Sequence, residues 1–360
     1  RRLRRRSSRL ASENAAMAAD AREGWVIDPS LLCVDRKRRL GRGGFGDVFA
    51  AKYLGSDVAC KIVRPDAAAS DAADGFVDEV SVLTKLHHPN ILMIIGVVRR
   101  GSHTTSEQEF WVVTELMERG SLRDVVAATR WSATAPLLLR LAADAARGLA
   151  FLHGRMPVIV HRDVKSPNIL VTSNWVGKIG DFGLSSKAAS IMNACSSKCE
   201  EPDISPLWAS PEALRGEAQT ARSDAYSFAT VLWECLSGKL PFERPLWDVY
   251  AAVLDGERPD MSQVRWTDGL QDGEFAARLE ALMRDGWSDD ASRRPTLLEY
   301  LEAIERFLQG RVVTLPVEAE SASALLAGHA RQRRSYEIEY EELVVEKEVA
   351  RGAFGAVHLA

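Results

Sequence analysis

The feature that most constrains this chain is a set of polar residues that occurs in a fixed order after a glycine-rich run. The run is Gly41-Arg42-Gly43-Gly44-Phe45-Gly46, and the residues that follow it are Lys61, Glu79, Asp163, Asn168 and Asp181. Each signal alone arises by chance in many proteins, but the ordered set is hard to produce by chance. We therefore expect one large domain that contains all of them.

The chain divides into a β-rich part followed by a helical part. Short runs of β-forming residues alternate with turns over 25–63, and a further run covers 110–115. Helical patterns cover 66–86, 137–153, 222–237, 275–286 and 296–309. With 46% hydrophobic residues the chain can bury a substantial core. We predict an α+β fold with a β-rich lobe of about residues 25–117 and a helical lobe of about 118–310.

Composition limits the cellular setting. The formal net charge of -4 gives no overall bias toward nucleic acid, so we expect no nucleic-acid partner. Five cysteines in a chain of 360 residues are too few for a disulfide framework and favour a reducing compartment such as the cytosol. The longest apolar run, 91–98, has the length of a strand and is far shorter than the ~18 residues of a membrane-spanning helix.

The first 24 residues are rich in Arg, Ser and Ala, with six arginines among the first nine. We predict a disordered basic tail. A basic flank is also typical of the cytoplasmic side of a membrane-spanning segment, so membrane contact through this flank is the alternative. The sequence begins at Arg1 rather than at Met, which favours a fragment of a longer protein.

The early residues of the ordered set suit a phosphorylated ligand. Glycines let a backbone approach a polyphosphate without side-chain clashes, and Val48 after the glycine run would cover a base. Lys61 lies in an apolar strand, where an unpaired charge is costly. Glu79 shares the inward face of the predicted helix 66–86, so we predict a buried ion pair between Lys61 and Glu79.

The late residues suit a proton transfer and a hard cation. The segment His161-Arg162-Asp163-Val164-Lys165-Ser166-Pro167-Asn168 follows an apolar run and is a loop by its proline and charges. Asp163 can accept the proton of an attacking hydroxyl, and Lys165 can neutralise a migrating phosphoryl group. Asn168 offers a neutral oxygen to a cation. Asp181, in Asp181-Phe182-Gly183, can bind Mg²⁺ that bridges phosphates.

These residues resemble the signature of the eukaryotic protein kinases over residues 25–310. The resemblance implies a bilobal protein kinase fold in which Lys61 holds the α- and β-phosphates of ATP and Glu79 orients it. It implies Asp163 as the catalytic base and Asn168 and Asp181 as Mg²⁺ ligands. The nucleotide site that it implies comprises Gly41, Gly43, Gly44, Phe45, Gly46, Val48, Ala59, Lys61, Thr114, Glu115, Met117 and Leu170, with 114–117 as the segment that holds adenine.

Two segments of the sequence indicate the subgroup of protein kinases that the chain resembles. Lys165, two residues after Asp163, is similar to serine/threonine kinases, and residues 161–170 and 223–234 resemble the tyrosine-kinase-like group, which includes Raf and the mixed-lineage kinases. The resemblance implies a cytoplasmic enzyme that transfers the γ-phosphoryl group of ATP to Ser or Thr of protein substrates. It also implies that Asp224 anchors the catalytic loop and that Arg294 pairs with Glu212.

Two departures from the family pattern keep other functions open. Ser210-Pro211-Glu212 replaces the usual Ala-Pro-Glu, and Ile204-Ser205 replaces Gly-Thr. The main alternative is a catalytically weak, pseudokinase-like scaffold that regulates an adjacent kinase domain. A small-molecule kinase of similar fold is disfavoured by the substrate-docking motif at 208–212.

The C-terminal end echoes the start of the domain. Residues 336–357 repeat the pattern of residues 25–48: an aromatic residue, any residue and Ile, then an apolar strand and a glycine loop that ends in Val. We interpret 336–360 as the truncated start of a second kinase domain and 311–335 as a linker. A chance glycine loop is the alternative. Ala350 stands where the first copy has Gly41, which predicts a weaker nucleotide loop.

Arg162 before Asp163 is associated in this family with control by phosphorylation of the activation loop. The candidate acceptors are Ser185, Ser186, Ser190, Ser196, Ser197 and Ser205. Ser196 and Ser197 are preferred because they lie in the middle of that loop. Cys195 and Cys199 in the same loop form either a redox clasp or two independent thiols.

Overall fold

The computed structural model of the protein describes residues 25–43, 46–63, 80, 83–100, 109–128, 135–181, 205–266, 273–309, 313, 347–352 and 355–359. The chain forms two compact units, Arg1–Pro316 and Val317–Ala360.

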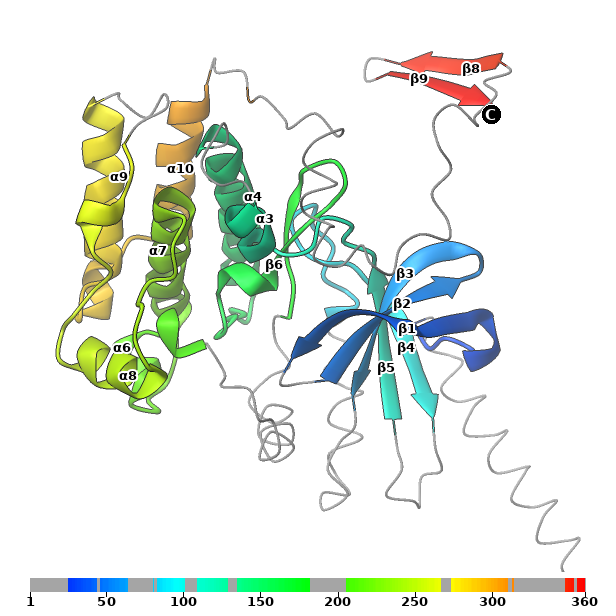
Figure 1. Ribbon diagram of the computed structural model, residues 1–360, viewed down its shortest axis with the longest axis horizontal. Helices are drawn as coiled ribbons and strands as arrows, with labels where there is room; N and C mark the ends of the chain where they lie inside the picture. The colour runs from blue at the N-terminus through cyan, green and yellow to red at the C-terminus, as the bar shows by residue number, and fades with distance from the viewer. Residues whose placement is uncertain are drawn as a thin grey trace, which may run out of the picture. The chain divides into compact units, whose positions relative to one another are not determined.

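The first unit begins with an antiparallel sheet of five strands in the order β1-β2-β3-β5-β4, drawn in blue to cyan in Figure 1. The strands are β1 Leu32–Gly43, β2 Gly46–Tyr53, β3 Ser56–Val63, β4 Ile94–Arg100 and β5 Glu109–Glu115. The runs 58–63 and 110–115 are strands as predicted. The apolar run 91–98 is not one strand: β4 begins only at Ile94, because Ile91 forms a bridge to Ile179 in another part of the domain.

Alternation along β3 separates the two faces of the sheet. Cys60 and Ile62 point into one cluster of buried residues, and Val63 points into a second cluster that also contains Val80. Lys61 lies two residues before Val63 and therefore on the same face as Val63 and Val80. Val80 belongs to the helix predicted at 66–86, most of which lies outside the described residues.

A short segment that begins at Trp25, the first described residue, lies on the edge of the sheet. The N–H of Ile27 donates to the carbonyl of Val97, and the N–H of Val97 donates to the carbonyl of Trp25, both at 2.9 Å. A side chain on Gly96 would place its Cβ 2.3 Å from the carbonyl oxygen of Trp25. Glycine at 96 therefore permits the close approach of this segment to β4.

The helical part follows, drawn in green to orange in Figure 1. Its helices are α3 Leu122–Ala128, α4 Ala135–His153, α6 Pro211–Leu214, α7 Ala221–Ser237, α8 Leu246–Leu254, α9 Gly273–Gly286 and α10 Leu297–Leu308. A two-stranded sheet of β6 Ile169–Val171 and β7 Gly177–Ile179 lies between α4 and α6 in the sequence. The predicted α+β bilobal fold is confirmed, and the four long predicted helices of the helical lobe match α4, α7, α9 and α10.

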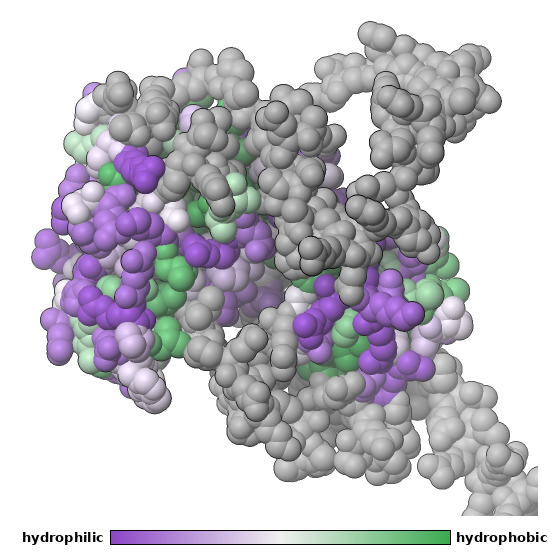
Figure 2. Space-filling view, in the orientation of Figure 1, coloured by the Kyte–Doolittle hydropathy of each residue, from purple (hydrophilic) through white to green (hydrophobic). Residues whose placement is uncertain are grey.

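Helix α7 is the centre of the helical core. Every residue from Ser223 to Ser237 is buried, and α7 packs against both α4 and α9. Thr220 caps its first turn in a reciprocal capping box with Ser223, and Gly238 ends it with a φ of 68°. Charged and polar side chains cover much of the face of the helical part seen in Figure 2, with smaller apolar areas between them. A helix that is buried from Ser223 to Ser237 gives the elements packed against it a rigid base.

The second unit contains one described hairpin, β8 Lys347–Gly352 and β9 Gly355–Leu359. Ala350 pairs with Val357 and Gly352 with Gly355, with an irregularity between Glu348 and Ala350. In the first unit Gly41 pairs with Val48 and Gly43 with Gly46, with an irregularity between Arg39 and Gly41. The two glycine hairpins thus share their register and the position of their bulge.

Within the described part of the chain, no helix is both long enough and apolar enough to cross a membrane. The predicted tail 1–24 and the predicted linker 311–335 lie outside the described residues, apart from Val313. The predicted domain boundaries stay predictions.

Candidate active site

The glycine run closes the β1–β2 hairpin. Gly43 pairs with Gly46, which has a φ of 130°, a backbone conformation that favours glycine. A Cβ on Gly46 would lie 2.1 Å from the carbonyl oxygen of Ile62, so no larger residue fits there without a shift of the backbone. Gly44 and Phe45 lie outside the described residues. Gly46 therefore brings backbone without a side chain against Ile62 of β3, the residue next to Lys61. Along β2, Gly46 lies two residues before Val48.

Strand pairing carries several predicted nucleotide residues across the sheet. Val48 pairs with Lys61 between β2 and β3, and Ala59 pairs with Thr114 between β3 and β5. The Thr114 hydroxyl donates to the carbonyl of Glu115 at 3.2 Å. The glycine hairpin, the lysine and the end of β5 therefore share one sheet.

Lys61 connects this sheet to the late residues of the ordered set. Its Nζ lies 2.5 Å from Oδ1 of Asp181, 120 residues further along the chain, and its side chain is only 12% exposed. Packing around the Asp181 carboxyl group raises its pKa, but the adjacent Lys61 ammonium outweighs this and holds the pKa below its ordinary value. Glu79 lies outside the described residues, so its pairing with Lys61 stays a prediction.

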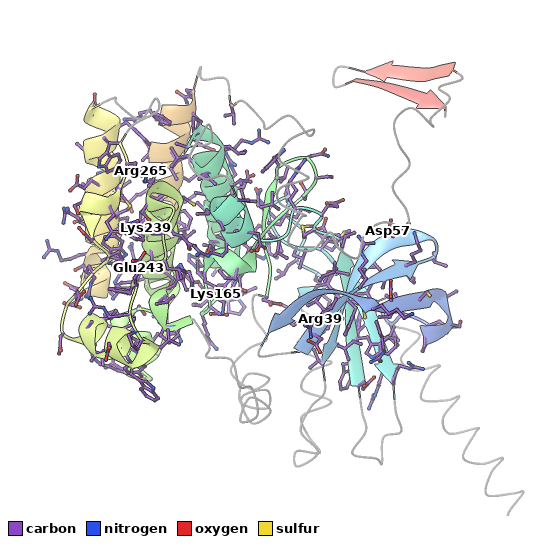
Figure 3. All side chains as sticks on the ribbon, in the orientation of Figure 1. Arg39, Asp57, Lys165, Lys239, Glu243 and Arg265 are labelled. Carbon is purple, nitrogen blue, oxygen red and sulfur yellow. The ribbon has the colours of Figure 1, made fainter. Side chains whose placement is uncertain are left out.

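The loop after α4 gathers the predicted base and its neighbours. Oδ2 of Asp163 lies 2.9 Å from Nζ of Lys165 and accepts a hydrogen bond of 2.9 Å from Nδ2 of Asn168. The same Nδ2 also donates to the backbone carbonyl of Asp163 at 2.8 Å. Lys165, labelled in Figure 3, is thus held beside the carboxylate rather than in bulk water. The loop therefore brings a cation and an amide within hydrogen-bonding distance of the Asp163 carboxylate.

Asp224 of α7 fixes the backbone of this loop, as predicted. Its carboxylate accepts the N–H groups of His161 at 2.8 Å and Arg162 at 2.9 Å, and it also contacts Nε2 of His153 at 2.8 Å. Arg162 has a φ of 70°, a left-handed conformation that these bonds stabilise. A buried carboxylate of helix α7 therefore fixes the backbone next to Asp163.

His161 links the loop to the strand that leads to Asp181. Its Nε2 lies 3.1 Å from the carbonyl of Gly180, and its Nδ1 lies 3.2 Å from the N–H of Asp163. Both contacts are hydrogen bonds when the ring proton is on Nε2. The N–H of Gly180 also donates to the carbonyl of Asn168 at 2.8 Å. Asp163, Asn168 and Asp181 are therefore parts of one hydrogen-bonded frame.

The donor set fits a hard divalent cation. Because Nδ2 of Asn168 is directed at Asp163, the amide oxygen is the atom left to act as a ligand. The lowered pKa of Asp181 keeps its carboxylate ionised at neutral pH. Oxygen donors of these two kinds are preferred by Mg²⁺ in combination with phosphate oxygens. Among the described residues no separate cluster of three or more His, Cys, Asp or Glu forms another metal site.

The end of β5 carries a contact that sequence reasoning missed. The carboxylate of Glu115 accepts hydrogen bonds from Nζ of Lys178 at 2.7 and 2.9 Å. Lys178 pairs in β7 with Leu170, so the predicted nucleotide residue Leu170 is joined to Glu115 through β7. Met117 lies just beyond β5, and its carbonyl accepts the N–H of Gly120. A lysine in a three-residue strand has no sequence period that could have indicated its partner.

The predicted pair of Arg294 and Glu212 is present and buried. Arg294 donates to both carboxylate oxygens of Glu212, at 2.5 and 2.8 Å. Burial raises the pKa of Glu212, but hydrogen bonds from Arg294 and Ser223 outweigh it and lower the pKa to about 2. Ser210, which departs from the family pattern, caps α6: its hydroxyl accepts the N–H of Ala213 at 3.4 Å. The departure therefore stabilises the helix that carries Glu212.

Several predictions concern residues outside the described part of the chain. These are the candidate phosphoserines except Ser205, Ile204, and the cysteine pair Cys195 and Cys199. Ser205 begins a short 3-10 helix, Ser205–Leu207. The regulatory role of this loop stays a prediction.

A sheet with a glycine hairpin, joined by a lysine to a carboxylate in a helical lobe, is typical of a protein kinase domain. Residues 34–304 match the family described as "Protein tyrosine and serine/threonine kinase". This match covers most of the chain, and the chain belongs to that family. It confirms the resemblance to eukaryotic protein kinases, and the similar proteins are consistent with the tyrosine-kinase-like group.

Similar proteins occur in a slime mould and in a plant. The chain is 33% identical over 274 residues to "Probable serine/threonine-protein kinase drkB" of Dictyostelium discoideum, which covers 74% of this chain and 36% of that protein. It is 31% identical over 294 residues to "Serine/threonine-protein kinase CTR1" of Arabidopsis thaliana, which covers 81% of this chain and 33% of that protein. The chain thus spans about a third of the length of these relatives.

Proposed function

We propose that this chain transfers the γ-phosphoryl group of ATP to Ser or Thr hydroxyls of protein substrates. The observation that carries the proposal is the 2.5 Å contact between Lys61 and Asp181, because it joins the glycine-hairpin sheet to the loop that holds Asp163. A phosphate chain bound between them would meet the lysine and the metal-binding carboxylate at once.

The residues around Asp163 suit the transfer step. Asp163 accepts the proton of the substrate hydroxyl, and Lys165, 2.9 Å from it, stabilises negative charge on the transferred group. Asn168 and Asp181 would hold Mg²⁺, which supplies positive charge to the phosphates when bound. Lys61 would hold the α- and β-phosphates, with Glu79 as its proposed orienting partner.

Two observations favour Ser and Thr over Tyr as acceptors. Lys165 occupies the position that is similar to serine/threonine kinases, and it contacts the proposed base directly. The relatives drkB and CTR1 are named as serine/threonine-protein kinases. The scaffold alternative rested on Ser210 and residues 204–205. Ser210 acts as a helix cap beside an intact Glu212–Arg294 pair, so it does not favour that alternative.

The test is ATP turnover by the purified chain with Mg²⁺ and a generic Ser/Thr protein substrate. The substitution Asp163→Asn should lower kcat at least about 100-fold, because it removes the proton acceptor, while nucleotide binding persists. Asp57→Asn is the matched control, since Asp57 is an exposed carboxylate in a surface ion pair with Lys52. Phosphoamino-acid analysis should find phosphoserine or phosphothreonine.

Either of two results would contradict the proposal. Labelling of tyrosine alone would remove the Ser/Thr specificity. A parent chain that binds nucleotide but does not turn it over, alone or after treatment with an activating kinase, would favour the scaffold function.

We also propose that residues 336–360 begin a second kinase domain in the same protein. The shared register of the two glycine hairpins supports this, including the bulge before Gly41 and Ala350. The replacement of Gly41 by Ala350 in the second copy is compatible with the same hairpin, since a Cβ at position 41 would meet nothing within 4 Å. The downstream coding sequence tests the idea: a lysine strand and a catalytic loop should follow Ala360.

We propose a cytoplasmic location, with membrane contact only through the basic N-terminal flank.

A further inference from the structure

Glu115, at the end of β5, contacts two other parts of the domain with one carboxylate. Its Oε1 accepts the N–H of Met93 at 2.7 Å, and its two oxygens accept Nζ of Lys178 at 2.7 and 2.9 Å. The Glu115 and Lys178 side chains are 21% and 16% exposed, so water screens this pair less than a surface pair. The pair joins residues 63 positions apart in the sequence.

The segment 90–93 forms a second connection between the same two places. The N–H of Glu115 donates to the carbonyl of Met93, and the N–H of Leu92 donates to the carbonyl of Ile179 at 2.8 Å. The N–H of Ile179 donates in turn to the carbonyl of Asn90 at 2.9 Å. The end of β5 is therefore connected to β7 in two ways: through the backbone of segment 90–93, and directly through the Glu115–Lys178 pair.

Strand β7 leads straight to the metal-binding carboxylate. Lys178 precedes Asp181 by three residues, and the intervening Gly180 is held by its hydrogen bond to Asn168. A short strand that is bonded on both sides transmits the position of Lys178 to Asp181. The Glu115–Lys178 pair thus lies between the backbone proposed to bind adenine and the carboxylate proposed to bind the metal.

We propose that Lys178 is a positioning residue that fixes the separation between the adenine-binding backbone at Glu115 and the carboxylate of Asp181. This rests on the nucleotide site of the proposed function. ATP has to be held at its base and at its phosphates at the same time, and a small misplacement of one end weakens binding of the whole molecule. Adenosine, which lacks the phosphates, reaches only the Glu115 end.

The test compares dissociation constants of Mg²⁺–ATP and adenosine for the full chain by isothermal titration calorimetry. Lys178→Met should raise the Kd of Mg²⁺–ATP about 10-fold, which corresponds to about 1.4 kcal/mol. The Kd of adenosine should stay within about 2-fold of the parent, because Glu115 keeps its two hydrogen bonds to Met93. Lys178→Arg, which retains the charge and the donors, should restore most of the Mg²⁺–ATP affinity.

A double-mutant cycle separates the pair from general damage. Glu115→Gln keeps an acceptor for the N–H of Met93 but removes the charge that faces Lys178. If the pair acts as a unit, the double variant binds Mg²⁺–ATP no more weakly than either single variant. Lys52→Met is the matched control, because the Lys52–Asp57 pair has a 3.0 Å contact and side chains that are 62% and 59% exposed. It should leave both dissociation constants unchanged.

Three results would overturn the proposal. An unchanged Kd for Mg²⁺–ATP in Lys178→Met, with a lowered melting temperature, would make the pair purely structural. An equal weakening of adenosine and Mg²⁺–ATP would mean that the adenine end alone is disturbed. A parent chain that binds no Mg²⁺–ATP would refute the proposed function itself, and this inference with it.

Discussion

Replacing Arg294 by Met removes a buried charge that donates to four acceptors beside the proposed substrate-docking motif at 208–212. The guanidinium, which is fully buried, donates to both oxygens of Glu212, to the carbonyl of Ser288 and to the carbonyl of Arg222. In Arg294→Met the Glu212 carboxylate, 14% exposed, retains only Ser223 as a side-chain donor at 2.7 Å. The variant therefore leaves a largely buried negative charge without its cation.

The expected loss of unfolding free energy follows from the pKa of Glu212. Lowering it from 4.5 to about 2 corresponds to roughly 3 kcal/mol of preference for the charged form. Removing one partner of a buried ion pair generally costs about 3–5 kcal/mol. We expect Arg294→Met to lose about 3 kcal/mol or more of unfolding free energy at pH 7, and about 5–8 °C of melting temperature for a domain of this size.

The dependence on pH gives an independent check. Because the pKa of Glu212 is lowered by folding, its contribution to stability is present above pH 4.5 and is lost as the pH falls from 4.5 toward 2. The variant lacks most of this contribution. The difference in unfolding free energy between parent and variant should therefore become smaller at acid pH. We expect this difference to be about 1 kcal/mol smaller at pH 4 than at pH 7.

Urea unfolding of parent and variant at both pH values measures these quantities. Arg306→Met is the matched control, since Arg306 pairs with Glu302 on the surface of α10 with side chains that are 75% and 72% exposed. We expect that control to change stability by less than about 0.5 kcal/mol. The reasoning is refuted if Arg294→Met loses less than 1 kcal/mol, or if its deficit is the same at pH 4 and pH 7.

Two further substitutions probe the glycine hairpin and the proposed metal site. Gly46→Ala should lower the unfolding free energy by about 2 kcal/mol, because its backbone has positive φ and its Cβ would lie 2.1 Å from the carbonyl oxygen of Ile62. Thermal melts test this against Gly41→Ala, where a Cβ meets nothing within 4 Å and at most a small change is expected. Asp181→Asn should weaken ATP binding at least about 10-fold in Mg²⁺ but not in EDTA, where no divalent cation is held, as a fluorescent ATP analogue would report. Equal weakening in both buffers would show that Asp181 is not a ligand of the proposed metal site.

The long helices and the buried pairs were predictable from sequence for a physical reason. Helices α4, α7 and α10 carry apolar residues at helical spacing over many residues, so their pattern is unambiguous. Asp224 and the Arg294–Glu212 pair come with family motifs at fixed positions, and their contacts are present. The cap at Ser210 was not predicted, although Ser followed by Pro and an acidic residue is typical of a helix start.

The connection between β5 and β7 was not predictable, and the run 91–98 explains why. Local sequence predicts that an apolar segment is buried in extended form, but it does not say which strand the segment pairs with. In the structure Ile94–Arg100 pairs with β5 as a strand, whereas Ile91 and Leu92 turn to Ile179 and Met93 exchanges hydrogen bonds with Glu115. A single continuous strand would satisfy the apolar pattern equally well. It would also remove the backbone connection through 90–93 between β7 and the end of β5, so the break at Ile94 is what allows one short segment to join the proposed adenine site to the strand that leads to Asp181.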